Sequence, residues 1–220
     1  ARWLAHKGAR QIVLVSRREP TESTADMIAE IRQLGCRVHV MLGDIGNRSD
    51  VAEIFRRIRK ELPPLKGVIH AAGLLDDGLM AEQTWSRFET VLAPKQTGSL
   101  LLHEMTQDLE LDFFILYSSA ASILGSPGQG NYATANAFLD GLAQQRVAAG
   151  LPALSINWGP WSEGMAASET VVRSLALQGL SPLTSEESHE VLEQLILSGA
   201  VQATVLDADW PRMRRRLSAY

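Results

Sequence analysis

Residues 113–149 read FFILYSSAASILGSPGQGNYATANAFLDGLAQQRVAA, and this stretch decides the fold class. It opens with an apolar run of strand length, and residues 131–149 have the pattern of a helix. Glycine and proline separate the two, as expected for a turn. A buried strand followed by a helix is the unit from which parallel sheets are built.

The same alternation continues on both sides of this unit. We expect strands at residues 11–16, 37–42, 67–71, 113–118, 153–158 and 202–206. We expect helices before Gly8 and at residues 22–34, 49–60, 84–105, 131–149 and 185–197. The pattern predicts an α/β fold, namely a Rossmann-like doubly wound parallel sheet with helices on both faces. A length of 220 residues fits one domain, residues 1–220.

The beginning of the chain is unusual for such a fold. Residues 1–5 have the pattern of the middle of a helix, which ends at Gly8. A doubly wound sheet has its first strand at the centre, followed by a glycine-rich turn that binds a pyrophosphate. No G-x-G-x-x-G precedes the strand at residues 11–16. We therefore expect an N-terminally truncated domain whose first strand and glycine-rich turn lie upstream.

Composition excludes several classes of function. A formal net charge of −4 argues against nucleic acid or an anionic membrane as the partner. Cys36 is the only cysteine, so neither an internal disulfide framework nor a metal cluster built on cysteine is expected. No apolar run approaches the roughly 20 residues of a membrane helix, and no signal-peptide pattern is present. The sequence predicts a soluble, cytoplasmic protein.

Three polar residues stand where chemistry is expected in this fold. Ser119 ends the strand at 113–118, and Tyr132 and Asn136 share one face of the following helix. Reduction of a carbonyl requires a hydride donor and a proton donor for the developing alkoxide. A phenol beside a hydroxyl can supply the proton and hold the oxygen. A nearby cation would lower the phenol pKa, and Lys95, in the preceding helix, is the candidate.

Several motifs together resemble the ketoreductases of polyketide synthases, over essentially the whole chain. They are PKQTG at residues 94–98, YSSAA at 117–121, GSPGQGNYATANAFLD at 125–140 and NWGPW at 157–161. Ordinary short-chain dehydrogenases carry a lysine four residues after the tyrosine, where this chain has Asn136. In the polyketide synthase ketoreductases, lysine and asparagine exchange places, as Lys95 and Asn136 do here.

The resemblance implies a role for each residue of this set. Tyr132 would protonate the alkoxide, and Ser119 would hydrogen-bond the substrate carbonyl. Lys95 would lower the phenol pKa and bind the nicotinamide ribose, while Asn136 would support the proton relay. Each residue alone could equally be a packing or capping residue, and the joint spacing favours catalysis.

The cofactor expected is NADPH. Ser16 and Arg17 end the strand at 11–16, and no carboxylate precedes Glu19 to bind a ribose hydroxyl. Arg17 is therefore the candidate for the 2′-phosphate, although it could be a solvated loop residue. Asp44 would contact the adenine or simply cap the next helix. The full cofactor set is Ser16, Arg17, Asp44, Ile45, Ala71, Ala72, Gly73, Lys95 and Tyr132.

The loop after the strand at 67–71 bears on stereochemistry. Leu75-Asp76-Asp77 is typical of B-type ketoreductases, which form the D-configured β-hydroxyl, and Leu124 stands where the opposite type has tryptophan. An ordinary acidic turn is the alternative. Residues 159–183 would form a lid over the substrate. The substrate-guiding set is Leu75, Asp76, Asp77, Leu124, Gln129 and Met165.

The expected partners are those of a multidomain synthase. They are an acyl carrier protein bearing a phosphopantetheine-linked β-ketoacyl chain, a neighbouring structural subdomain and other synthase domains. The basic end at residues 212–216 indicates a solvated linker or a docking site for an acidic carrier. The rival functions are a catalytically silent domain and a free-standing short-chain dehydrogenase.

Overall fold

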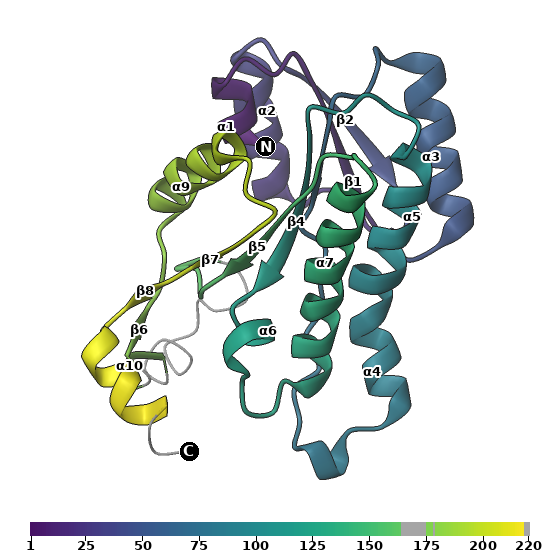
Figure 1. Ribbon diagram of the computed structural model, residues 1–220. Helices are drawn as coiled ribbons and strands as arrows, with labels where there is room; N and C mark the ends of the chain where they lie inside the picture. Colours follow the sequence, from purple (N-terminus) through teal and green to yellow (C-terminus); the bar gives the residue numbers. More distant parts are fainter. Residues whose placement is uncertain (164–174, 178, 218–220) are drawn as a thin grey trace.

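The computed structural model describes residues 1–163, 175–177 and 179–217. In these residues a parallel sheet lies between two layers of helices (Figure 1). The strands are β1 Gln11–Ser16, β2 Arg37–Leu42, β3 Gly67–His70, β4 Phe113–Ser119, β5 Leu154–Trp158, β6 Leu180–Ser181, β7 Gln202–Val205 and β8 Asp207–Ala208. The α-helices are α1 Arg2–His6, α2 Glu22–Gln33, α3 Arg48–Glu61, α4 Trp85–Leu92, α5 Gly98–Thr106, α6 Ala121–Leu124, α7 Gly130–Ala148, α9 Ser185–Ser198 and α10 Trp210–Leu217. A 3₁₀ helix, η1, spans Met80–Glu82, and a π-helical turn, η2, spans Ala93–Thr97.

The parallel sheet consists of two hydrogen-bonded parts. β1 pairs with β2, and the second part has the order β3-β4-β5-β7, with every pairing parallel. Among the described residues, no ladder joins β1 to β3. In the 3-2-1-4-5-6 order of a doubly wound sheet, β2 and β1 take the first two positions and β3, β4 and β5 the last three. This order agrees with the predicted Rossmann-like fold class, which is confirmed.

The burial of β1 differs from expectation. The apolar run at residues 11–16 predicts a buried strand, yet only Ile12 is buried, and Val15 is 39% exposed. The prediction was wrong for β1 because this strand has a neighbour on one edge only within the described chain. β5, which has neighbours on both edges, is buried at every residue.

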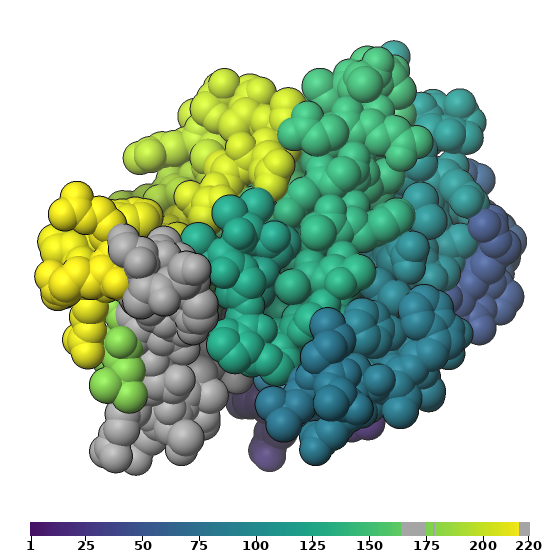
Figure 2. All heavy atoms as spheres, turned by 60° about the horizontal axis from the view of Figure 1, so that its bottom comes forward, coloured from purple at the N-terminus to yellow at the C-terminus, as the bar shows by residue number. Residues whose placement is uncertain are grey.

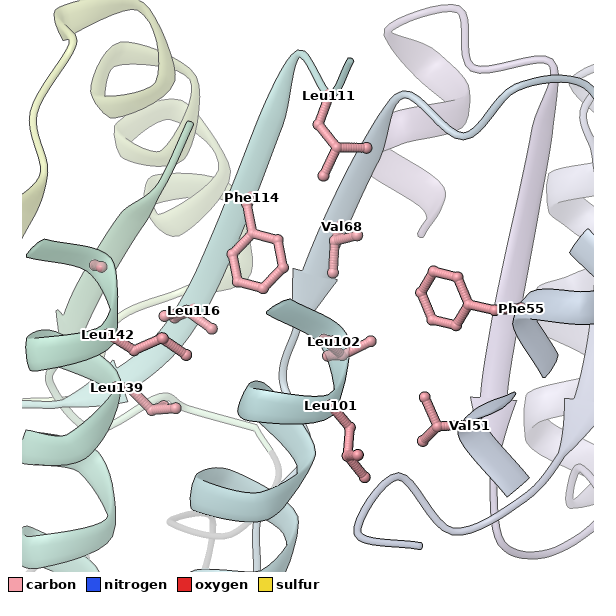
Figure 3. Close-up of a cluster of buried hydrophobic side chains, with 11 residues drawn as sticks. Val51, Phe55, Val68, Leu101, Leu102, Leu111, Phe114, Leu116, Leu139 and Leu142 are labelled. Carbon is pink, nitrogen blue, oxygen red and sulfur yellow. The ribbon is translucent and has the colours of Figure 1, made fainter. Parts of the chain in front are cut away.

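Helices cover both faces of the sheet. On one face α3, α5 and α7 pack against β3 and β4, and Figure 3 shows Phe55 of α3 beside Val68 of β3, and Val51 of α3 beside Leu101 of α5. On the other face α1 and α2 pack on β1 and β2, and α9 packs on β4 and β5. Burying each such leucine or phenylalanine side chain contributes roughly 1.5–3 kcal/mol.

α3 connects the two parts of the sheet. Val51 and Phe55 belong to the apolar cluster around β3 and β4, whereas Ile54 and Ile58 pack with Met41 of β2. Both groups lie on one amphipathic helix, so α3 is buried against both parts at once.

Four local features were not expected from the sequence. The helix expected at 84–105 is continuous through α4, η2 and α5 but contains a π turn at Ala93–Thr97. The short α6 and the antiparallel pair β6–β8 were not predicted. The solvated linker expected at the basic end is wrong for Trp210–Leu217, which forms α10. Asp209 caps this helix by accepting a hydrogen bond from the Arg212 N–H group. An aspartate before a helix is a common N-cap, but the arginines that follow it favoured a solvated segment.

No helix among the described residues has the length and hydrophobicity to cross a lipid bilayer. Part of the expected lid, residues 164–174 and 178, lies outside the described residues.

Candidate active site

A cleft of about 500 Å³ opens at the carboxyl ends of β3, β4 and β5. This end of the molecule faces the reader in Figure 2, where α6 lies between α10 on one side and α4 on the other. Ala71 and Gly73 follow β3 into the cleft wall, Ser119 comes from the end of β4, and Trp158 comes from the end of β5. Parallel strands place their carboxyl ends at one edge of the sheet, and for this reason residues distant in sequence converge here.

Ser119, Tyr132 and Asn136 are brought together in this cleft. Ser119 is the last residue of β4, and its Oγ accepts a 3.2 Å hydrogen bond from the Ala121 N–H group. This bond occupies a lone pair of the hydroxyl and leaves its proton available for an acceptor. Tyr132 lies in the first turn of α7 and interacts with the side chains of both Ser119 and Asn136. Asn136 donates to the Tyr132 carbonyl at 2.8 Å, while its buried Oδ1 has no partner among the described residues.

The phenol of Tyr132 is held in its neutral form. Burial raises its pKa above the ordinary value, and the negative charge of Asp77 acts in the same direction. Hydrogen bonding with Ser119 and Asn136 acts in the opposite direction and only partly offsets the burial. A neutral phenol is the form that can donate a proton.

Lys95 reaches the same cleft from a different element. It lies in the π turn η2, is 3% exposed, and donates a 2.8 Å hydrogen bond to the Tyr117 carbonyl of β4. Its Nζ stands 5.8 Å from the centroid of the Tyr132 ring. Burial lowers the pKa of Lys95 to about 8, and the carboxylate of Asp140 opposes this shift. The positive charge favours the phenolate form of a nearby tyrosine, which is the effect expected of this lysine.

A buried polar network lies behind Ser119. The Asp140 carboxylate of α7 accepts hydrogen bonds from Ser155 Oγ at 2.6 Å, Ser122 Oγ at 2.8 Å and Asn157 Nδ2 at 2.8 Å. Ser122 Oγ also lies 2.8 Å from the Ser119 carbonyl. The network therefore ties the end of β4 to α6, α7 and β5, and a buried carboxylate with this many partners is well satisfied.

The Leu-Asp-Asp loop lines one side of the cleft through two of its three residues. Leu75 and Asp77 line the cleft, and Gln129 donates to Asp77 Oδ2 at 2.9 Å. Asp76 does not line it. Its Oδ1 accepts hydrogen bonds from Arg87 Nη2 at 2.6 Å and Nε at 3.0 Å. Asp76 thus holds the loop against α4.

Two of the remaining three substrate-guiding residues also line the cleft. Leu124 of α6 and Gln129 line the cleft. Met165 lies outside the described residues.

The cofactor candidates occupy the adjoining strand ends. Ser16 and Arg17 lie at the end of β1, and Asp44 and Ile45 follow β2. Arg17 Nη1 lies 4.0 Å from Asp44 Oδ2, and both side chains are about half exposed. Ser16 Oγ donates to the Arg18 carbonyl at 2.7 Å.

These residues have the size and polarity to hold a dinucleotide at the strand ends. A Cβ at Gly73 would come within 3.0 Å of Lys95 Cε, so the backbone at this position is kept free of side chain beside the lysine. The unpartnered Oδ1 of Asn136 offers a buried acceptor in the same region. Ala71 and Ala72 are exposed and add only a methyl group each.

Sequence reasoning missed two features of the site. Arg87, which binds Asp76, lies eleven residues away in a different element, and no sequence motif indicates this contact. Trp158 and Trp161 line the cleft and pack with Tyr117, with ring centroids 5.3–6.3 Å apart. Both tryptophans lie in the NWGPW motif, which could have suggested an aromatic wall.

Comparison with known proteins agrees with this geometry. The family model described as KR domain matches residues 1–163. The phenolphthiocerol synthesis polyketide synthase type I Pks15/1 of Mycobacterium marinum is 42% identical over 219 residues, which cover 96% of this chain and 10% of that protein. The polyketide synthase Pks1 of Mycobacterium tuberculosis, whose name includes the word inactive, is 44% identical over 191 residues, covering 84% of this chain and 12% of that protein.

A solved structure gives the same result for the fold. The structure titled as A-type ketoreductases from a modular polyketide synthase superposes with a TM-score of 0.94 at 38% identity. It covers 99% of this chain, which spans 46% of the solved chain and about a tenth of the two synthases.

The fold and the family match therefore define a Rossmann-like domain of the ketoreductase class. This chain belongs to the ketoreductase (KR) domain family of polyketide synthases.

Proposed function

We propose that this chain catalyses NADPH-dependent reduction of a carrier-bound β-ketoacyl thioester to the D-β-hydroxyacyl thioester. The observation that carries the proposal is the convergence of Ser119, Tyr132 and Lys95 on one cleft from three different elements. A hydroxyl donor, a neutral phenol and a cation are the groups that reduction of a ketone requires around its oxygen.

Each residue has a defined task. When bound, the nicotinamide supplies the hydride to the β-carbon. Ser119 donates its hydroxyl proton as a hydrogen bond to the ketone oxygen, because its lone pair is engaged by the Ala121 N–H group. Tyr132 transfers the phenolic proton to the same oxygen as negative charge develops there. Lys95 stabilises the resulting phenolate, and Asn136 Oδ1 can accept a hydrogen bond from a water molecule that returns a proton from solvent to Tyr132.

The preference for NADPH rests on the end of β1. Arg17 is exposed there and can bind a phosphate monoester by charge-assisted hydrogen bonds, whereas NAD-binding proteins place a carboxylate near this position. Asp44 is the nearest acid, at 4.0 Å from the guanidinium, and it follows β2 rather than β1.

The proposed partner is an acyl carrier protein that delivers the thioester, together with other domains of a synthase. The relatives support this proposal because they are synthases about ten times the length of this chain. A structural subdomain beside the catalytic domain belongs to the same proposal.

The D configuration is proposed from the loop at Leu75 and Asp77, which lines the cleft together with Trp161 and Leu180. Gln129 donates a 2.9 Å hydrogen bond to Asp77, and Leu124 adds an aliphatic side chain to the cleft lining. An acyl chain entering beside this loop would present one face of its ketone to the nicotinamide.

The experiment follows the loss of NADPH absorbance with a β-ketoacyl thioester and the full-length protein, and then determines the configuration of the product. Turnover giving the D-alcohol supports the whole proposal. Turnover giving the L-alcohol retains the reductase and refutes the stereochemical assignment. Binding of NADPH without turnover of a carrier-bound substrate would favour a catalytically silent domain.

A further inference from the structure

His70 is a buried residue of the cleft region that the proposed reaction does not use. It ends β3, is 3% exposed, and has Nε2 at 2.9 Å from the carbonyl oxygen of Pro94. A carbonyl oxygen can only accept, so the ring carries its hydrogen on Nε2 and donates it. Pro94 immediately precedes Lys95 in η2. A single hydrogen bond therefore connects the end of β3 to the segment that presents the lysine.

This segment is an irregular part of its helix. α4 runs into α5 through the π turn Ala93–Thr97, in which the regular hydrogen-bond ladder is interrupted. An extra residue in a helix rotates the side chains that follow by roughly 100° relative to a regular ladder. The direction of Lys95 thus depends on the π turn being kept at this place in the helix.

Close packing on the next residues of the helix fixes the turn against the sheet. A Cβ at Gly98 would approach Ile45 Cγ2 to 3.1 Å, the Ile45 carbonyl to 3.3 Å and His70 Cε1 to 3.5 Å. The helix therefore lies directly against the ends of β2 and β3. The His70 hydrogen bond and the Gly98 contact hold the turn from its two ends.

We propose that His70 is a positioning residue: it holds the π turn at Pro94 and thereby directs Lys95 toward Tyr132. The inference rests on the role proposed for Lys95 in ketone reduction. A strand end, rather than the helix itself, then determines where the cation stands.

The ring remains a neutral donor throughout the physiological range. Burial, followed by the positive charge of Lys95, lowers the pKa of His70 to about 4, while the hydrogen bond to Pro94 acts in the opposite direction. Histidine here serves as a fixed N–H group, and its own titration does not contribute near neutral pH.

The test compares two substitutions of His70 in the full-length protein. His70→Leu removes the donor and keeps an apolar side chain, whereas His70→Gln retains an N–H donor of similar reach. Ile58→Ala is the matched control, because it truncates a buried side chain of α3 that packs with Met41 and Ile54 rather than with η2. The readouts are kcat, the melting temperature, and the pH-dependent rate at which Lys95 reacts with an amine acylating reagent, measured by mass spectrometry without cofactor.

We expect His70→Leu to change the acylation rate of Lys95 and to lower kcat by roughly 10²-fold, the loss typical of a catalytic group displaced by about 1 Å. His70→Gln should restore most of both values. The Ile58→Ala variant should lower the melting temperature without changing Lys95 reactivity.

Two results would overturn the inference. One is a His70→Leu protein in which Lys95 reacts as in the wild type, and the other is an Ile58→Ala protein that shows the same change in Lys95 reactivity. Lys95→Ala separates this inference from the proposed function. Wild-type turnover in that variant refutes the catalytic role of Lys95, whereas the acylation rates test positioning independently of turnover.

Discussion

The ammonium group of Lys95 faces the ring of Tyr132 at 5.8 Å from its centroid, although the two residues come from different helical segments. Short-chain dehydrogenases that carry both residues on one helix fix their separation by helical geometry alone. Here the separation depends on how η2 packs against α7 and the sheet. Mutations that alter this packing are therefore expected to affect the chemistry without removing either residue.

Tyr132→Phe should abolish reduction and leave cofactor binding nearly intact. General acid catalysis contributes about 10²–10⁴-fold to rate, and the variant keeps the ring over which Lys95 lies. The measurements are single-turnover rates with a β-ketoacyl thioester and the dissociation constant of NADPH. Tyr117→Phe is the control, because it removes a phenol from the same cleft whose pKa burial raises to about 12. Turnover at the wild-type rate in Tyr132→Phe would remove this residue from the mechanism.

Arg17→Ala should weaken the binding of NADPH and leave the affinity for NADH unchanged. A hydrogen bond to a charged group is worth about 1.5–3 kcal/mol, so the dissociation constant of NADPH should rise by roughly 10- to 100-fold. Arg18→Ala, which alters the neighbouring exposed arginine, serves as the control. Equal losses for both cofactors would refute a role in phosphate recognition.

The rate of reduction should fall as pH rises through about 8, because burial lowers the pKa of Lys95 to about 8 and the neutral amine no longer stabilises the phenolate. The Asp140 carboxylate raises this pKa, so Asp140→Asn should move the alkaline limb of the kcat/KM profile to lower pH. Ser155→Ala breaks a 2.6 Å hydrogen bond to the same carboxylate but keeps its charge, and its limb should stay in place. Equal displacement of the limb in both variants would contradict this assignment.

Arg87→Ala should reduce the stereochemical purity of the product more than it reduces stability. Arg87 binds Asp76 at 2.6 Å and the Asp77 carbonyl at 2.6 Å, so its loss releases the loop that lines the cleft. Its side chain is 27% exposed, and the measurement is the ratio of product enantiomers beside the melting temperature. Arg56→Ala, which removes an ion pair within α3, is the control and should change neither value appreciably. An unchanged enantiomer ratio in Arg87→Ala would count against the loop as the stereochemical determinant.

The class of fold follows from the sequence because strands and helices alternate with distinct periodicities. The apolar runs at β4 and β5 were recognisable, since both faces of a central parallel strand are buried. The π turn in η2 could not be recognised from the sequence. A single π turn around Pro94 does not change the apolar periodicity of the helix enough to be distinguished from an α turn. α10 was missed because its arginines suggested solvent rather than a helix.

The candidate site was predictable to the extent that it follows strand ends. Ser119, Tyr132 and Lys95 do meet in one cleft. Contacts between a loop and a distant helix could not be predicted from the sequence. The hydrogen bond from Arg87 to Asp76, for example, depends on how α4 packs. The raised pKa of Tyr132 was unforeseen, because desolvation depends on tertiary burial rather than on neighbouring residues in sequence.

The proposed cofactor would contact several separate elements at once. Arg17 and Asp44 follow β1 and β2, whereas Lys95 and Tyr132 belong to η2 and α7. A ligand that binds only the folded arrangement of these elements stabilises that arrangement. β1 is buried at one residue and β5 at every residue, so we expect NADPH to slow amide hydrogen exchange in β1 more than in β5. Cofactor binding would then raise the local stability of the strand that precedes Arg17.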